Sequence, residues 1–508
     1  MESILMEHAN ENCLKRIKDN IYILIILGIV AIITYGFEIS NWTLTVDEEI
    51  WSHVDKFTFA KGWIGDGRWG IALLKLILPT YKVLPFFNGI LAVIVLTASS
   101  FFVALTFLNF FKSNIGATIS AVIFLTMPIH SYYLMFDTFS VEISIGIFCA
   151  LLSAYNVWYA VLHNKYKKMI ISLVLMTFSW SIYQSNFMIY TCFICALLML
   201  SVIWEIKNKI EITGGVKYYK KIIIYSIGNL IIAFGIYEII KTILQKIWGA
   251  STYINGYFRW SYVDRNTCLQ QIKVYLTQLF LRPSELLYGG KILTFFFALG
   301  AISFITLLIK GKERRIIVIL SYIALNLSIC IEYIIMAGSV PLRSLPVIAL
   351  YISVISFMVL FLIEVKYLKQ IMVIFLSIII LYQSSDVIEL FYSEYNRQEY
   401  DLAFLNRVVI KIEDLNKGEI PEEPVIFIGR HSWSSLYSIN TEQFDDSIFS
   451  LGEPGRIYRY LMDLGYNYNL PTAEMTEQAN KIAQNMPIWP YEGSVVCEDG
   501  MIIVNLGE

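Results

Sequence analysis

Three consecutive acidic residues, Asp47, Glu48 and Glu49, follow the first long apolar segment of the chain. A carboxylate at a membrane surface can accept the proton of a hydroxyl group and so act as a general base. A second interpretation is structural, because Thr45 and Glu48 have the spacing of a helix capping box and acidic side chains favour the positive end of a helix dipole. The pattern leaves both interpretations open, and the structural one explains Asp47 least well.

The residues after the carboxylates predict interfacial helices within the segment 46–80. Apolar side chains recur there at helical spacing, which is typical of a helix lying along a membrane surface. The stretch GWIGDGRWG adds glycines that permit tight turns, together with Trp63, Arg68 and Trp69. Indole rings suit the headgroup level of a bilayer and also stack on sugar rings, whereas a guanidinium binds phosphate. An interfacial anchor and a ligand site both fit this stretch.

Other polar residues fall inside apolar segments or at their ends. Tyr183 and Gln184 occupy the turn SIYQSNF, Asp137 precedes the fourth apolar segment, and Glu332 lies late in the ninth. Ionisable residues at membrane depth are costly and are functional by default, although Glu332 could simply pair with a neighbouring span. Arg343 lies between two prolines in AGSVPLRSLP. Its guanidinium could bind phosphate through two hydrogen bonds or form a structural ion pair.

The composition indicates a polytopic α-helical membrane protein. Of the 508 residues, 57% are hydrophobic and 16% are charged, with a mean hydropathy of +0.60. A soluble protein would have about 25% charged residues. The net charge of −2 argues against a nucleic-acid partner. Apolar stretches predict about eleven transmembrane helices. They cover residues 20–38, 82–110, 116–134, 139–160, 169–183, 186–204, 222–245, 291–309, 316–336, 346–364 and 370–385.

Basic residues mark one side of the membrane. Lys and Arg cluster before the first span and after the fourth, sixth, eighth and tenth, whereas the short turns near 135–138 and 184–185 carry none. Short cytoplasmic loops are enriched in these residues. We therefore expect a multi-pass protein of the cytoplasmic membrane with a cytoplasmic N-terminus, and an odd number of spans places the C-terminus outside.

Two domains are expected, a transmembrane domain over 1–385 and a small extracytoplasmic α/β domain over 386–508. In the second, YDLAFLNRVVIKIEDLN, GRIYRYLMDLG and TAEMTEQANKIAQNM predict helices, and PVIFIG predicts a buried strand. The stretch SVVCEDGMIIVNL predicts a hairpin that turns at Asp499-Gly500.

Four features occur in a characteristic order. They are an acidic pair followed by GRW in the first outer loop, the YQS turn, an arginine in a late outer loop, and the C-terminal stretch MPIWPYEGSVVCEDGMIIV. Over nearly its whole length the chain thus resembles the integral-membrane glucosyltransferases of O-antigen modification (Gtr type II), which belong with the GT-C glycosyltransferases. The resemblance implies a bacterial enzyme that takes a sugar, by default glucose, from a polyprenyl-phosphate donor. The acceptor would be a cell-envelope polysaccharide or lipid-linked glycan, such as an O-antigen or teichoic acid, and the anomeric carbon would be inverted.

Together, the residues and the resemblance predict a GT-C-like hexosyltransferase. Asp47, with Glu48 as the alternative, would deprotonate the acceptor hydroxyl. Arg343 and Arg68 would stabilise the leaving phosphate. The expected sugar or acceptor contacts are Trp63, Trp69, Tyr183, Gln184 and Asp137. No cofactor is expected, and a divalent metal held by the carboxylates is the alternative.

Two other functions compete with this prediction. A transporter or flippase of lipid-linked sugars would usually be built from paired halves, and no internal repeat is visible in the chain. A non-catalytic scaffold for envelope assembly would tolerate the exchange of Asp47 and Arg343. Transfer of a radiolabelled sugar from a lipid-phosphate donor distinguishes the enzyme from both.

Overall fold

The protein divides into two compact units in a computed structural model that describes residues 13–84, 86–111, 113–209, 212, 215–338 and 340–507. The helical unit comprises the described residues of Met1–Ile39 and Lys56–Ile388, and the C-terminal unit comprises those of Ser40–Asp55 and Glu389–Glu508. Unlike the expected division at residue 385, this division assigns the segment Ser40–Asp55, with its three carboxylates, to the C-terminal unit.

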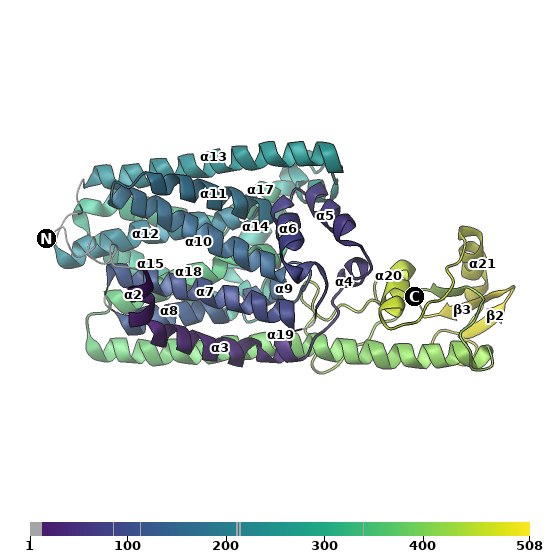
Figure 1. Ribbon diagram of the computed structural model, residues 1–508. Coiled ribbons are helices and arrows are strands. Elements are labelled where there is room, and N and C mark those ends of the chain that lie inside the picture. The colour runs from purple at the N-terminus through teal and green to yellow at the C-terminus, as the bar shows by residue number, and fades with distance from the viewer. Residues whose placement is uncertain are drawn as a thin grey trace. The chain divides into compact units, whose positions relative to one another are not determined.

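Helices make up the helical unit (Figure 1). They are α2 (Cys13–Asp19), α3 (Ile21–Ser40), α5 (Lys56–Gly65), α6 (Trp69–Ile77), α7 (Phe87–Phe110), α8 (Asn114–Thr126), α9 (Ser131–Leu134), α10 (Ser140–Leu162), α11 (Lys167–Ile182), α12 (Asn186–Asn208), α13 (Val216–Trp248), α14 (Arg265–Leu281), α15 (Lys291–Lys310), α16 (Arg315–Ser328), α17 (Ile331–Met336), α18 (Val347–Leu362) and the first part of α19 (Lys366–Leu415). Short 3-10 helices join them: η1 (Pro79–Tyr81), η2 (Pro128–His130), η3 (Tyr253–Tyr257), η4 (Arg259–Ser261), η5 (Pro283–Glu285), η6 (Lys312–Arg314) and η7 (Leu342–Ser344).

Among the described residues, seven helices are long and apolar enough to cross a membrane, consistent with a polytopic membrane protein. They are α3, α7, α10, α12, α13, α15 and α19. An eighth span results if α8 and the segment Pro128–Leu134, which meet at a bend of 40°, form one broken span. The other expected spans contain α11, α16 and α18, which have 16, 14 and 16 residues. Because a helix needs about 20 residues to cross the hydrocarbon core, the count of eleven stays a prediction.

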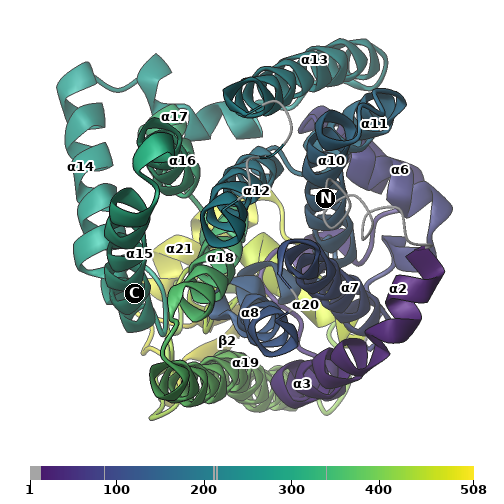
Figure 2. The same ribbon diagram turned by 90° about the vertical axis from the view of Figure 1, so that its left-hand side faces the viewer.

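The most buried helices lie in the middle of the helical unit. Figure 2 looks along the helices and shows α12 and α18 surrounded by other helices. The apolar stretch of α12 is 89% buried, against 28% for that of α13 at the periphery. At another edge α3 and α19 lie side by side, and the hydroxyl groups of Thr34 and Ser384 share a hydrogen bond of 2.9 Å.

The segment 46–80 contains three short helices, α4 (Glu48–Trp51), α5 and α6. α4 is four residues long, and a break separates it from α5. One half of the expected capping box is present, because Glu48 Oε2 accepts a hydrogen bond from the backbone N–H of Thr45 at 3.2 Å. Asp47 has a φ of 86°, in the left-handed region, so it cannot belong to a right-handed helix that starts at Thr45.

The C-terminal unit contains a three-stranded sheet of order β1–β3–β2. Its further elements are β1 (Val425–Ile428), α20 (Pro454–Asp463), α21 (Ala473–Ala483), β2 (Val495–Glu498) and β3 (Met501–Asn505). β1 pairs with β3 in parallel, and β2 pairs with β3 as an antiparallel hairpin. The predicted turn is present: Asp499 and Gly500 have φ angles of 50° and 73°, as favoured in two-residue hairpins.

Alternating side chains of the sheet face two different helical layers. Val425 and Phe427 of β1 join a core with the end of α19 and with α20. Ile426, the residue between them, belongs to a second core on α21. The sheet is therefore covered on both faces, which explains why β1 reads as a continuous apolar run in the sequence.

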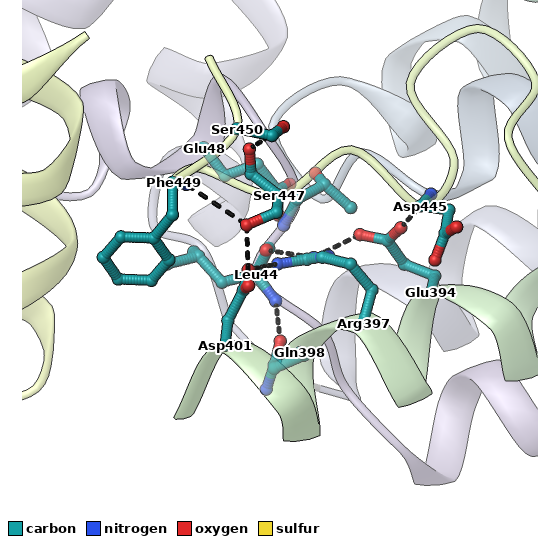
Figure 3. A network of polar contacts seen from close by, with 11 residues as sticks. Leu44, Glu48, Glu394, Arg397, Gln398, Asp401, Asp445, Ser447, Phe449 and Ser450 are labelled. Carbon is teal, nitrogen blue, oxygen red and sulfur yellow. Dashed lines mark hydrogen bonds and ion pairs between the residues drawn. The ribbon is translucent and has the colours of Figure 1, made fainter. Parts of the chain in front are cut away.

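Arg397 of α19 is fully buried and attaches the segment 40–55 to this helix (Figure 3). Its Nη2 donates a hydrogen bond to the carbonyl of Leu44 at 2.9 Å and forms an ion pair with Glu394. Its Nη1 donates to Asp401 at 3.0 Å. Since a buried charge is tolerated only when it is paired, these contacts hold the start of the carboxylate segment in one place.

Candidate active site

A cavity of about 780 Å³ in the helical unit is lined by four residues predicted from the sequence: Arg68, Tyr183, Gln184 and Arg343. They come from the start of α6, from the turn between α11 and α12, and from η7. The volume is within the range of small-molecule sites, roughly 300–1,000 Å³. The fold thus brings polar residues that are far apart in the sequence to one concave site.

Two glycines of the GRW stretch allow Arg68 to reach this cavity. Gly67 has a φ of 74°, and a Cβ there would lie 2.9 Å from Cδ of Lys241. Gly70 lies so close to α11 that a Cβ would collide with Oγ of Ser181. A side chain at either position would push α6 away from its neighbours, so the glycines place the start of α6 against the cavity wall.

The Arg68 guanidinium is held by aromatic rings. Its carbon lies 4.7 Å from the centroid of the Tyr183 ring and 5.6 Å from that of Trp63. Such stacking positions a guanidinium while leaving its N–H groups available for an anion. The Nε of Arg68 has no hydrogen-bond partner among the described residues.

The YQS turn contributes three different contacts to the cavity wall. Tyr183 supports Arg68, and Gln184 Nε2 donates a hydrogen bond to the hydroxyl of Tyr237 at 3.0 Å. Ser185 Oγ donates to the carboxylate of Glu332 on α17. The turn therefore connects α6, α13 and α17 around the cavity.

Arg343 supplies a second cation to the same wall. It belongs to η7, and its guanidinium carbon lies 5.7 Å from the centroid of the Phe136 ring. Tyr257, from the loop after α13, also lines the cavity and shares a hydrogen bond of 2.9 Å with the hydroxyl of Tyr253. Two arginines from distant segments thus line one cavity, where a guanidinium can bind an anionic group of a ligand.

One side of the cavity is apolar and exposed. Ile231 and Phe234 of α13 and Ile335 of α17 line the cavity and are 64%, 43% and 40% exposed. On a membrane-embedded surface, exposed apolar side chains contact lipid tails. A ligand with an apolar chain could therefore enter between α13 and α17 with its chain still in the bilayer.

The three carboxylates lie in the C-terminal unit and have different surroundings. Arg456 of α20 forms ion pairs with Asp47 at 2.8 Å and with Glu49 at 2.7 Å, and Gln443 Nε2 donates to Asp47 at 3.3 Å. Glu49 is fully buried, and this burial raises its pKa although Arg456 opposes the shift. Glu48 is buried as well, whereas the Asp47 side chain is 41% exposed.

Three predicted contact residues do not line the cavity. Trp63 is buried, and its ring centroid lies 5.7 Å from that of Phe139. Trp69 is the first residue of α6 and follows Arg68 directly in the chain. Asp137 is buried in the turn before α10, where its carbonyl accepts a hydrogen bond from Asn88.

Several residues around these sites were not predicted. Asp66 lines the cavity and belongs to the GDGRW motif itself, so that motif could have revealed it. Tyr237 lies within an apolar helix, where a tyrosine gives no functional signal. Arg456 is 409 residues away from Asp47, and only a prediction of long-range contacts could have paired them.

No metal site accompanies these groups in the part of the chain that the structure describes: no three or more His, Cys, Asp or Glu side chains are arranged to hold a metal ion. Comparison with known proteins gives one match. A family model described as Glucosyl transferase GtrII matches residues 36–361, more than half of the chain. This range includes the three carboxylates and the cavity residues named above. No curated protein and no solved structure matches the chain.

Proposed function

The chain belongs to the glucosyl transferase GtrII family, and we propose that it transfers a hexose, by default glucose, from a polyprenyl-phosphate donor to a cell-envelope glycan. The observation that carries the proposal is one cavity that combines two arginines with an apolar, exposed side. A lipid-phosphate sugar is amphipathic in the same way, since it has an anionic head and a hydrocarbon tail.

Arg68 and Arg343 are proposed to bind the donor phosphate, with the lipid chain passing Ile231 and Phe234. In the reaction, the acceptor oxygen forms a bond to the anomeric carbon from the face opposite the phosphate. The bond between that carbon and the phosphate oxygen breaks, and its electron pair stays on the lipid phosphate. The two guanidinium groups stabilise this developing charge.

Asp47 is the proposed acceptor of the hydroxyl proton. Among the three carboxylates it is the exposed one, whereas buried Glu48 already accepts the N–H of Thr45. Arg456 and Gln443 orient the Asp47 side chain. One base is sufficient, because the lipid phosphate leaves without protonation, unlike the leaving group of a glycosidase. No cofactor is part of this proposal.

The proposed topology has eleven spans in a GT-C-like arrangement, a cytoplasmic N-terminus and an extracytoplasmic C-terminal α/β domain. It rests on the alternation of basic short loops along the chain. A reporter that is active only in the cytoplasm, fused after Glu508, should be silent. Strong reporter activity would contradict the topology.

The function itself is tested with isolated membranes, a polyprenyl-phosphate donor carrying radiolabelled glucose, and envelope glycan. Membranes that contain the protein should move label to the glycan, and membranes without it should not. A lipid-linked sugar transporter would move label across sealed vesicles without forming a new glycosidic bond. A scaffold would neither transfer the label to glycan nor move it across the vesicle membrane. Either of these two outcomes would contradict the proposed transferase function.

A further inference from the structure

Glu332 is a buried carboxylate in the cavity wall. It is the second residue of α17, is only 5% exposed, and lines the cavity together with Ser185. Ser185 Oγ donates a hydrogen bond to Oε1 of Glu332. The other oxygen, Oε2, is buried and has no hydrogen-bond partner among the described residues.

Two other acidic side chains of the helical unit each lie next to a lysine. Glu142 is also fully buried, but it lies 3.1 Å from Lys75 Nζ and accepts a hydrogen bond from Thr80 at 2.7 Å. Glu238 lines the cavity, but it forms an ion pair with Lys241 at 2.6 Å. Burying a carboxylate costs several kcal/mol unless hydrogen bonds and charges compensate it.

Only part of that compensation is present at Glu332. Ser185 donates a hydrogen bond to one oxygen, the hydroxyl of Ser344 is a second polar neighbour, and Arg68 acts on the carboxyl group electrostatically. Ser344 donates its own hydrogen bond to the carbonyl of Pro341 at 2.7 Å, so a further partner for the second oxygen can come from the cavity. A carboxyl group forms hydrogen bonds with hydroxyl groups whether or not it carries a proton. Hydroxyl groups of a sugar are therefore suitable partners for the second oxygen.

We propose that Glu332, oriented by Ser185, binds hydroxyl groups of the transferred sugar and so selects a hexose by the positions of its hydroxyl groups. The inference rests on the proposed function, in which Arg68 and Arg343 bind the donor phosphate. It adds that Glu332 contacts the sugar of the same donor. The phosphate then contacts guanidinium groups, and the sugar hydroxyl groups contact a carboxyl group.

The test uses the purified full-length protein in lipid nanodiscs with short-chain polyprenyl-phosphate donors. Donors carrying glucose and single deoxyglucoses are compared for KM and kcat. Glu332→Gln replaces the carboxyl group by an amide of similar shape and should raise the KM for the glucose donor about 10-fold, as expected for a lost hydrogen bond. It should also reduce the preference for glucose over the affected deoxyglucose.

Two further variants separate binding from folding. Glu332→Asp keeps the carboxyl group and should retain most of the sugar preference, and Ser185→Ala should weaken the preference without abolishing transfer. Glu238→Gln is the matched control, because it neutralises another cavity carboxylate and should leave the preference unchanged. If Glu332→Gln does not fold, the same comparison is made between Glu332→Asp and Ser185→Ala.

The outcomes are distinct. Suppose that the parent protein transfers glucose and that Glu332→Gln keeps the parental KM and sugar preference. The inference about Glu332 is then wrong, and the proposed function stands. Ser185→Ala serves for this comparison if Glu332→Gln does not fold. If Glu238→Gln changes the preference as much as Glu332→Gln does, the effect is one of net charge and the subsite is wrong. If the parent protein neither binds nor uses any lipid-phosphate sugar, the proposed function fails and the subsite fails with it.

Discussion

The guanidinium of Arg68 stacks on the ring of Tyr183, with 4.7 Å between its carbon and the ring centroid. The two residues belong to the GRW and YQS motifs, which are more than a hundred positions apart in the chain. Both motifs are short, and this contact joins them in the wall of one cavity.

We expect Arg68→Ala to reduce donor use by roughly 10–100-fold, because a charge-assisted contact to the donor phosphate is lost. Arg68→Lys should fall between this variant and the parent, since the charge remains but the planar fork and its stacking on Tyr183 are lost. The measurement is the donor KM in purified protein. Lys61→Ala removes an exposed cation from neighbouring α5 and is the control. Equal donor KM values for all variants and the parent would show that Arg68 does not bind the donor.

Asp47→Asn should abolish transfer without preventing folding. Asparagine is nearly isosteric and tolerates the left-handed conformation of this position, but it cannot accept the acceptor's proton. Loss of a general base typically lowers kcat by roughly 10²–10⁴-fold. Glu48→Gln should keep most activity, because glutamine can still accept the N–H of Thr45.

Asp66→Asn belongs in the same experiment, since Asp66 lines the cavity in the helical unit. All variants are compared at matched protein abundance, and donor binding is measured separately. An active Asp47→Asn variant together with an inactive Glu48→Gln variant would show that Glu48 is the base. An inactive Asp66→Asn variant with unchanged donor binding would instead identify Asp66, in the cavity, as the base.

The ion-pair network of Arg397 should dominate the stability of the C-terminal unit. Arg397→Ala leaves the buried carboxylates of Glu394 and Asp401 without their cation, which typically costs about 3–5 kcal/mol. Arg407→Ala on the same helix removes an exposed arginine that lies 5.5 Å from the Trp489 ring, and should cost less than about 1 kcal/mol. Proteolysis of the full-length protein over a urea gradient measures both. Similar losses from the two variants would contradict the structural role of Arg397.

The contribution of Asp446 to the stability of the C-terminal unit should be greater in mild acid than at neutral pH. Burial, reinforced by the negative charge of Glu394, raises the pKa of Asp446 from 3.8 to about 6. A carboxylate with a raised folded pKa contributes stability that is complete below its unfolded pKa and is lost as the pH rises through the folded value. The contribution of Asp446 is thus present at pH 3.8 and lost above about 6.

Asp446→Asn tests this pH dependence, because asparagine does not titrate. The melting temperature of the variant minus that of the parent should increase as the pH rises from about 4 to about 7. A fluorescent label on exposed Cys497, in a Cys13→Ser background, reports melting of this unit. A difference that is independent of pH would contradict the raised pKa of Asp446.

The sequence was informative where a local pattern has a local cause. Apolar runs identified the long helices, alternation and Asp-Gly identified the hairpin, and the arginine and YQS positions were found from their polarity at membrane depth. The left-handed conformation of Asp47 and its ion pair with Arg456, far away in the chain, were not predicted, because neither follows from the neighbouring residues. Likewise, the neighbouring residues in the sequence do not predict that Trp63 packs against Phe139. Nor do they predict that one oxygen of Glu332 has no hydrogen-bond partner among the described residues.

The rate of sugar transfer by purified Arg68→Ala/Arg343→Ala protein tests the central claim most directly. The parent, the double variant and Arg68→Lys/Arg343→Lys are assayed with a polyprenyl-phosphate glucose donor and a glycan acceptor, after equal folding has been shown by thermal melting. We predict that the parent transfers glucose, that the double lysine variant retains a fraction of this activity, and that the double alanine variant loses donor binding and transfer together. Transfer by the double alanine variant at the parental rate and parental donor KM would show that this cavity is not the donor site.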